Sequence, residues 1–300
     1  MEFLSYLISG ISLGSVYAII ALGYTMVYGI AKMLNFAHGD VIMVGGYITF
    51  CAMSYLGLPG WAALILAMIF CTVLGIVIEG LAYRPLREAP SLAVLITAIG
   101  VSYLLQNSAL LIWGATPKVF SPIIPTTKAD GTPTTLQLFD GQLSISYIAL
   151  LTMACCILIM VALTLFTSKT KMGKAMRACS EDKGAAQLMG INVNKTISTT
   201  FAIGSGLAAV AGVLMCSSYP TLMPTTGSMP GIKAFTAAVF GGIGSIPGAF
   251  LGGILLGVIE ALARAYISTQ LSNSIVFAVL IVVLLVRPAG LLGKIVPEKV

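Results

Sequence analysis

Long apolar runs follow one another along almost the whole 300-residue chain, and they restrict what it can fold into. A helix needs about 20 apolar residues to cross a membrane's hydrocarbon core of roughly 30 Å. Charged residues make up only 9% of the chain, against about 25% in a soluble domain. We predict an all-α, polytopic membrane protein with eight or nine transmembrane helices in one domain, residues 1–300. The apolar runs are residues 3–30, 41–57, 61–83, 91–113, 145–167, 196–218, 232–246, 249–268 and 272–287.

The uneven distribution of basic residues predicts the orientation of the chain. The interval 168–195 is rich in Lys and Arg and holds only two acidic residues, so the positive-inside rule places it in the cytoplasm. Counting spans backwards puts the interval 114–144 and the N-terminus outside. The first run has no preceding basic segment and no small-residue cleavage site, so we interpret it as a retained span. Counting forwards, the basic C-terminal region is cytoplasmic only if the run 232–246 crosses the membrane, which leaves the span count open.

Several function classes find no support in the sequence. The net charge of +6 comes from basic residues scattered among loops, without the basic face that predicts nucleic-acid binding. The six cysteines form no CxxC pair, and one histidine cannot form a metal site, so no metal ligands are predicted. No glycine-rich stretch has the spacing of a phosphate-binding loop, so we predict no ATP site in this chain. A nucleophile suited to an intramembrane protease is also not evident.

A polar interruption stands inside apolar sequence, in the stretch LNFAHGDVIMVGGY at residues 34–47. Asn35 and Asp40 are good helix N-cap residues, and the glycines lower the cost of breaking the backbone, so we predict a helix interruption here. At membrane depth, broken backbone is tolerated only where protein buries it or water reaches it. The segment is therefore expected to face the bundle interior or a substrate pathway. Its candidate pathway residues are Asn35, Phe36, His38, Asp40, Gly45 and Gly46.

A second glycine-rich break, GGIGS at 241–245, opens a segment that is similar to an earlier part of the chain. Residues 57–84 and 244–266 each follow a Gly-rich helix, begin with a Pro-Gly turn and end on Ile-Glu-x-Leu-Ala, in opposite predicted orientation. Two breaks at corresponding positions of an inverted repeat indicate a substrate route, which would include Gly241, Gly242 and Gly244. Free helix amides there would receive a substrate carboxylate.

Other interpretations of these two breaks remain open. A shared Gly/Pro pattern also arises from close helix packing. The side chains of Asn35, His38 and Asp40 also fit a purely structural role, as caps and interhelical hydrogen bonders.

Charged residues inside apolar runs require a partner or an interface, because an unpaired charge at a helix centre costs about 2.5–3.5 kcal/mol on insertion scales. Glu260 and Arg264 are spaced i,i+4 and are expected to pair on one helix face. Glu79 lies about one turn from Arg84, and we expect those two to pair. The competing hypothesis is a secondary transporter driven by an ion gradient, with Asp40, Glu79 or Glu260 as its coupling carboxylate.

The basic interval contains a short helical segment with an Ala185-Ala186-x-x-x-Gly190 core. Two alanines followed by a glycine offer a flat docking surface, although a solvated linker helix fits the same spacing. The core resembles the coupling segment by which ABC-importer permeases dock on their ATPases, with Gly184 in place of the usual leading Glu. The coupling residues that this resemblance implies are Arg177, Ala185, Ala186 and Gly190.

Three stretches together, residues 34–47, 173–201 and 241–260, resemble the LivH permease family of high-affinity branched-chain amino-acid ABC importers. The resemblance implies a multi-pass subunit of the bacterial cytoplasmic (inner) membrane. Its implied partners are a second related permease, two cytoplasmic ATPases that bind ATP and Mg, and an external solute-binding protein. Relatives of this type can also carry urea or short amides, so the solute remains open between these and Leu, Ile or Val.

Overall fold

The structure is a computed structural model that describes residues 2–87, 89–125, 134–138 and 143–293. Its longer helices are α1 (Glu2–Ala31), α2 (His38–Ser54), α3 (Gly60–Ile78), α4 (Ser91–Trp113), α5 (Tyr147–Lys169), α8 (Val193–Ser218), α9 (Ser228–Gly241), α10 (Ile246–Tyr266) and α11 (Ser272–Val286). The shorter ones are α6 (Lys171–Glu181) and α7 (Lys183–Leu188), with a π-helical turn at Glu79–Tyr83 and a 3₁₀ turn at Arg84–Leu86.

The prediction of a polytopic helical membrane protein is confirmed. Each apolar run of the sequence overlaps one helix, and six described helices are long and apolar enough to cross a membrane. The other three, α2, α9 and α11, have 17, 14 and 15 residues. At 1.5 Å per residue, α9 is about 21 Å long and spans only part of a hydrocarbon core. The count of eight or nine crossings therefore stays a prediction.

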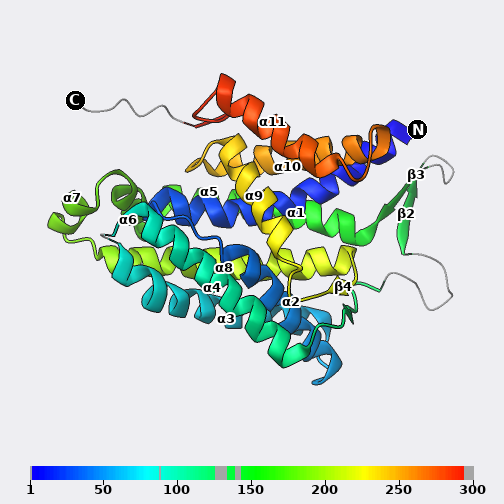
Figure 1. Ribbon diagram of the computed structural model, residues 1–300, viewed down its shortest axis with the longest axis horizontal. Coiled ribbons are helices and arrows are strands. Elements are labelled where there is room, and N and C mark those ends of the chain that lie inside the picture. Colours follow the sequence, from blue (N-terminus) through cyan, green and yellow to red (C-terminus); the bar gives the residue numbers. More distant parts are fainter. Residues whose placement is uncertain (1, 88, 126–133, 139–142, 294–300) are drawn as a thin grey trace.

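The helices lie roughly along one long axis with distinct ends (Figure 1). Helices α6 and α7 form one end, which we call the α6–α7 end. The N-terminus lies at the opposite end, which we call the β2–β3 end after two short strands there. The interval 114–144 begins and ends at the β2–β3 end, and the interval 168–195 occupies the other (Figure 1). The two polar intervals thus lie at opposite ends, as counting spans predicts.

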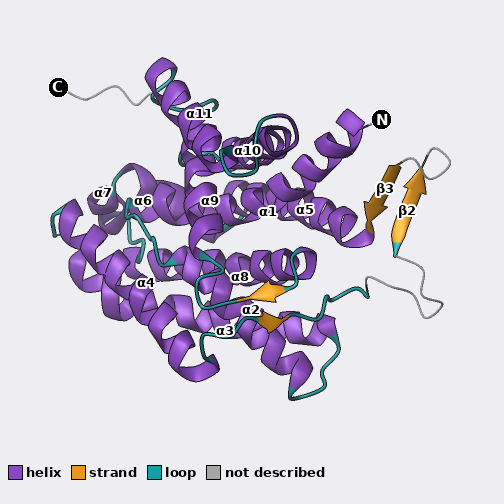
Figure 2. Ribbon diagram, turned by 45° about the vertical axis from the view of Figure 1, so that its right-hand side comes forward, coloured by secondary structure: helices purple, strands orange, loops and turns teal. Residues whose placement is uncertain are grey.

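The described residues also form short strands, in two separate pairs (Figure 2). Strand β1 (Lys118–Val119) pairs antiparallel with β4 (Thr221–Leu222), and β2 (Thr135–Leu138) pairs antiparallel with β3 (Leu143–Ser146). The all-α prediction did not include them. Such two-stranded ladders satisfy local backbone groups without adding a sheet to the core.

Two units of consecutive helices pack against each other, so that each contributes a helix to the other's main contact. The first unit is α1, α2 and α3, and the second is α8, α9 and α10. Helix α1 packs most extensively on α10, while α8 packs most extensively on α3. In Figure 1, α3 runs toward the α6–α7 end and α10 runs away from it. The arrangement has the opposed directions that the predicted inverted repeat requires.

Small residues allow these helices to approach closely. A Cβ atom added at Gly14 of α1 would lie 2.7 Å from the carbonyl oxygen of Ile254 on α10. One added at Gly257 of α10 would collide with the backbone of Gly14. Without a water-driven hydrophobic effect between helices in lipid, such close packing is a main source of association.

Candidate functional site

The predicted helix interruption after the first span is confirmed. Helix α1 ends at Ala31, Lys32 adopts a left-handed backbone with φ of 58°, and α2 begins at His38. The break therefore lies at residues 32–37, before the glycines of the stretch. Gly45 and Gly46 are inside α2.

The predicted capping roles of Asn35 and Asp40 are wrong. The N-cap residue of α2 is Ala37, and no side chain caps the helix. Asp40 lies in the first helical turn, too far along the chain to cap it. The Asn35 side-chain oxygen instead accepts a hydrogen bond from the Tyr83 hydroxyl at 2.9 Å. Asn35 thus ties the break to the end of α3.

Asp40 is buried at a point where three helices meet. Its Oδ1 accepts a hydrogen bond from Nε2 of Gln106 on α4 at 2.9 Å. The same Gln106 nitrogen lies 3.2 Å from the hydroxyl of Ser228, the first residue of α9. No Lys or Arg of the described chain pairs with Asp40, but negative charge is favourable in the first turn of a helix. Asp40 and Gln106 therefore form a polar junction between α2, α4 and α9.

The N-terminal ends of the shorter helices α2 and α9 pack against each other. A Cβ added at Gly39 would lie 2.7 Å from the Gly227 carbonyl oxygen, and one added at Gly231 would lie 2.7 Å from the Gly39 Cα. Only glycine permits this approach, because any side chain would meet backbone. Two helix starts and one carboxylate thus meet at the same place.

His38 and Phe36 are held by rings from neighbouring helices. His38 is buried, and its ring packs edge-on against Tyr24 with centroids 4.6 Å apart. Its two nitrogens have no hydrogen-bond partner in the described part of the chain. Phe36 is half-buried and lies 5.7 Å from Phe235 between ring centroids. His38 is therefore placed by packing.

The remaining pathway candidates of the first stretch face α8 and strand β4. A Cβ added at Gly45 would lie 2.7 Å from the Cα of Ala209 on α8, and one added at Gly46 would lie 3.0 Å from the Leu222 side chain. These positions support close helix packing. That Gly45 and Gly46 also line a pathway stays a prediction.

The second predicted break is confirmed between α9 and α10. Gly242 and Gly244 have φ of 105° and 91°, a backbone region that other residues rarely adopt. Ser245 then caps α10 by accepting a hydrogen bond from the Gly248 amide at 3.2 Å. Gly241 packs directly on Gly248, so the two helices fold back tightly. The break turns the chain at the α6–α7 end (Figure 1).

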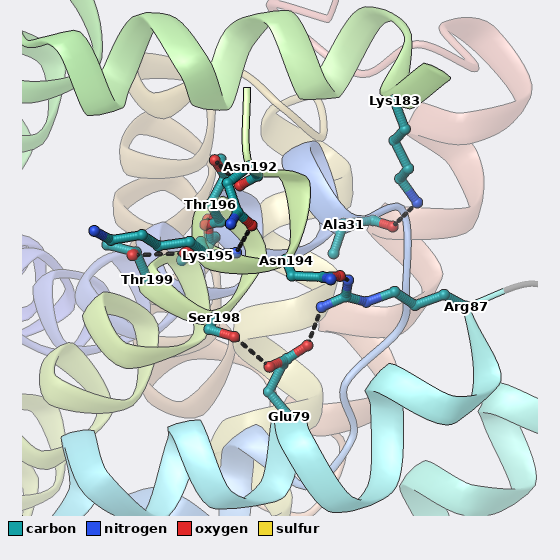
Figure 3. A network of polar contacts seen from close by, with 11 residues as sticks. Ala31, Glu79, Arg87, Lys183, Asn192, Asn194, Lys195, Thr196, Ser198 and Thr199 are labelled. Atoms are coloured by element: carbon teal, nitrogen blue, oxygen red, sulfur yellow. Dashed lines mark hydrogen bonds and ion pairs between the residues drawn. The ribbon is translucent and has the colours of Figure 1, made fainter. Parts of the chain in front are cut away.

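The buried carboxylate of Glu79 pairs with Arg87, and the predicted pairing with Arg84 is wrong. The π-helical and 3₁₀ turns redirect the chain after Glu79, so Arg84 is exposed while Arg87 reaches back. Figure 3 shows Arg87 between Glu79 and Asn194, with Ser198 of α8 donating to the second carboxylate oxygen. This network joins the end of α3 to the start of α8.

A lysine from α7 reaches the end of α1. The Lys183 ammonium group donates to the Ala31 carbonyl oxygen at 2.9 Å, as Figure 3 shows. Burial lowers the pKa of Lys183, and the neighbouring charges of Arg87 and Lys32 lower it further. A cation at the C-terminal end of a helix complements the helix dipole. Lys183 therefore connects the 168–195 interval with the residue before the first break.

Three of the predicted coupling residues, Ala185, Ala186 and Gly190, lie around one exposed tip. Ala186 is buried, while Ala185 is exposed and Gly190 ends the turn with φ of 80°. Between them, Leu188 and Met189 are 90% and 82% exposed. Two such apolar side chains beside small residues form an uncovered apolar patch, and exposed apolar patches often mark interaction sites. The tip lies at the outer limit of the α6–α7 end (Figure 1).

Arg177 lies on α6 rather than at the tip. Its guanidinium group is exposed and donates to the Ser168 carbonyl oxygen at 3.3 Å. This contact braces α6 against the end of α5. That Arg177 takes part in coupling stays a prediction.

The predicted pair of Glu260 and Arg264 is confirmed, but a third residue takes part. The Lys233 ammonium group of α9 lies 2.7 Å from a Glu260 carboxylate oxygen. Lys233 was not predicted from the sequence as a partner of Glu260, although a lysine inside the apolar run 232–246 indicates a buried ion pair. The carboxylate thus links α9 with α10.

Short helices whose N-terminal ends meet beside a buried carboxylate, within a polytopic helical bundle, are typical of membrane transporters. Known proteins agree with this class. The chain belongs to the family described as "Branched-chain amino acid transport system / permease component", which matches residues 6–285.

Two curated relatives show how far the similarity extends. The chain is 45% identical to the high-affinity branched-chain amino acid transport system permease protein BraD of Pseudomonas aeruginosa, over 100% of this chain and 98% of that protein. It is also 45% identical to LivH of Escherichia coli, with the same coverage. The solved structure titled "PsaBC from Streptococcus pneumoniae in complex with Fab" aligns over 94% of this chain and 90% of that chain, with 17% identity and a TM-score of 0.46.

Proposed function

We propose that this protein moves branched-chain amino acids across the bacterial inner membrane as one permease subunit of an ATP-driven importer. The observation that carries the proposal is the full-length similarity to two permeases named for that transport. ATP would be hydrolysed, with Mg, by two partner ATPases, and an external binding protein would deliver the solute. A second related permease would complete the membrane part.

The ATPases would dock on the α7 tip formed by Ala185, Ala186, Leu188, Met189 and Gly190. Its exposed apolar side chains support this role. Movement of the tip would be transmitted to the first break by the hydrogen bond between Lys183 and the Ala31 carbonyl oxygen. With the interval 168–195 in the cytoplasm, the N-terminus and the interval 114–144 lie outside.

The substrate route would follow the polar junction of α2, α4 and α9. The buried Asp40 and the half-buried Gln106 and Ser228 are the polar groups that support this placement, next to Asn35, Phe36 and His38. Junctions of broken helices near the bilayer midplane are the usual position of a solute site in transporters. Gly241, Gly242 and Gly244 would allow the second break to move.

Uptake in proteoliposomes tests the proposal. The chain alone is compared with the chain plus its second permease, ATPases and binding protein, with ATP on the ATPase side. We expect uptake of leucine, isoleucine and valine only by the full set and only with hydrolysable ATP. Uptake of urea or a short amide, and not of these amino acids, would contradict the assignment of the solute.

The same assay separates ATP-driven transport from ion-driven transport. Glu79 and Glu260 are both ion-paired, whereas Asp40 pairs with no cation of the described chain. An ion-coupled carrier would depend on the Asp40 carboxylate. We expect Asp40→Asn to keep ATP-driven uptake, because asparagine keeps an oxygen for Gln106. Gradient-driven uptake by the chain alone, lost in this variant, would contradict the ABC assignment.

A further inference from the structure

A cavity of about 350 Å³ lies among α1, α8, α9 and α10, and none of Asp40, Gln106 and Ser228 lines it. It is bounded by the last residues of α8 and α10, the first turn of α9 and the middle of α1. The ends of α8 and α10 place it toward the β2–β3 end (Figure 1). Its volume lies within the range of about 300–1,000 Å³ that is usual for small-molecule sites.

The cavity wall combines a large apolar surface with a few polar groups. The apolar part includes Leu13, Val16, Met215 and Met229. The polar groups include the ammonium group of Lys233, the guanidinium group of Arg264 and the hydroxyl group of Tyr17. None of the residues that line the cavity is acidic.

The charged groups at this wall, together with the carboxylate that they contact, carry a net positive charge. Glu260 is fully buried, and its carboxylate interacts with both Lys233 and Arg264. The Tyr17 hydroxyl also donates to Glu260, at 3.0 Å. Two cations therefore share one carboxylate, and the cluster keeps a charge of +1. Glu260 itself does not line the cavity, so the cavity faces the cations and not the anion.

The surplus charge is placed to receive an anion. The Arg264 side chain is 37% exposed, while Glu260 occupies only part of its donor groups. A guanidinium group has five N–H donors and binds carboxylates in a planar, two-point geometry. At membrane depth, a second carboxylate would compensate the remaining charge.

We propose that this cavity binds the transported solute, with the solute carboxylate at Arg264 and Lys233 and its apolar side chain against Leu13, Val16, Met215 and Met229. This inference rests on the proposed function and deepens it. The site would accept small apolar molecules that carry a carboxylate and would reject urea and short amides, which carry none. It would be the first station that the solute meets at the β2–β3 end.

The test measures binding to the assembled permease and ATPase complex without its soluble binding protein, in nanodiscs of uncharged lipid. The probes are radiolabelled leucine, with 4-methylpentanoate and 4-methylpentanamide as competitors. These competitors share leucine's carbon skeleton and differ in having a carboxylate or an amide. We expect the carboxylate to displace leucine at a concentration at least about tenfold lower than the amide, because charged hydrogen bonds are the stronger ones.

Arg264→Gln removes the surplus charge and leaves Lys233 paired with Glu260. We expect leucine binding to weaken about tenfold or more, and the preference for the carboxylate competitor to disappear. Arg264→Lys is the matched control, since it keeps the charge, and it should keep the preference. Met229→Trp fills the cavity with the charges intact and should also abolish binding. If the Arg264→Gln complex does not assemble, leucine binding by Met229→Trp tests the proposed site.

Three results would overturn the inference. One is that wild-type complex binds no leucine at millimolar concentration. Another is equal weakening of both competitors in Arg264→Gln, which would mean that the ion cluster is only structural. The third is full leucine binding by Met229→Trp, which would mean that leucine binds outside this cavity. If the complete importer still takes up leucine in any of these cases, the proposed function stands and only the assigned site fails.

Discussion

Glu79 shows how one buried carboxylate is stabilised at the α6–α7 end. Its charge is compensated by Arg87 and by the Ser198 hydroxyl, whereas Arg84 is exposed. Removing one partner of a buried ion pair is costly, typically about 3–5 kcal/mol, because the other charge stays buried without compensation.

We therefore predict that Arg87→Gln lowers the thermal unfolding temperature of the purified protein, while Arg84→Gln leaves it nearly unchanged. Both variants remove one positive charge from neighbouring positions, so they are matched. The measurement is thermal unfolding in detergent, followed by the loss of monodisperse protein. An equal effect of the two variants would mean that the local charge, and not the ion pair, stabilises this region.

At the scale of helices, the contact between α1 and α10 depends on glycine. A Cβ atom at Gly257 would collide with the backbone of Gly14, and backbone cannot move aside as a side chain can. Gly100 of α4 is different, because a Cβ atom added there would meet nothing within 4 Å. The two glycines are both helical, so they differ in packing and not in backbone conformation.

We predict that Gly257→Ala destabilises the protein by about 1–3 kcal/mol, the usual effect of overpacking. Gly100→Ala should be neutral or slightly stabilising, because alanine is the better helix former. Unfolding by a denaturing detergent, compared between the two variants, gives the measurement. Loss of stability in both would indicate that α4 is packed more tightly in lipid than in this structure.

Helix positions could be predicted from the sequence where apolar length decides them. The run 91–113 matches α4, and the run 272–287 matches α11 to within one residue. The run 232–246 differs from α9 because hydropathy continues through the break, where Gly242 and Gly244 turn the backbone. Apolar composition does not register a change of backbone direction.

Side-chain partners were harder to predict than helices. Spacing along one helix correctly predicted Glu260 with Arg264, because a regular helix fixes that distance. It failed for Glu79, where non-α turns intervene, and for Asn35, whose partner Tyr83 comes from another helix. The junction of Asp40 with Gln106 also needs the tertiary structure, since three helices build it.

For the whole molecule, the distribution of basic residues predicts one orientation in the membrane. The interval 168–195 and the interval 114–144 lie at opposite ends of the bundle (Figure 1). Basic residues are concentrated in the first of them, and the positive-inside rule assigns such intervals to the cytoplasm. An inverted structure would place these charges on the outside, against that rule.

We predict that a cysteine introduced at Ser121 reacts with a membrane-impermeant maleimide in intact cells, while one introduced at Leu188 reacts only after permeabilisation. Both positions are exposed, so accessibility depends on the side of the membrane and not on burial. The unmodified chain provides the background from its native cysteines, of which Cys51 and Cys155 are half-buried. The reverse labelling pattern would place the α7 tip outside, where no ATPase could reach it, and would refute both the orientation and the proposed coupling.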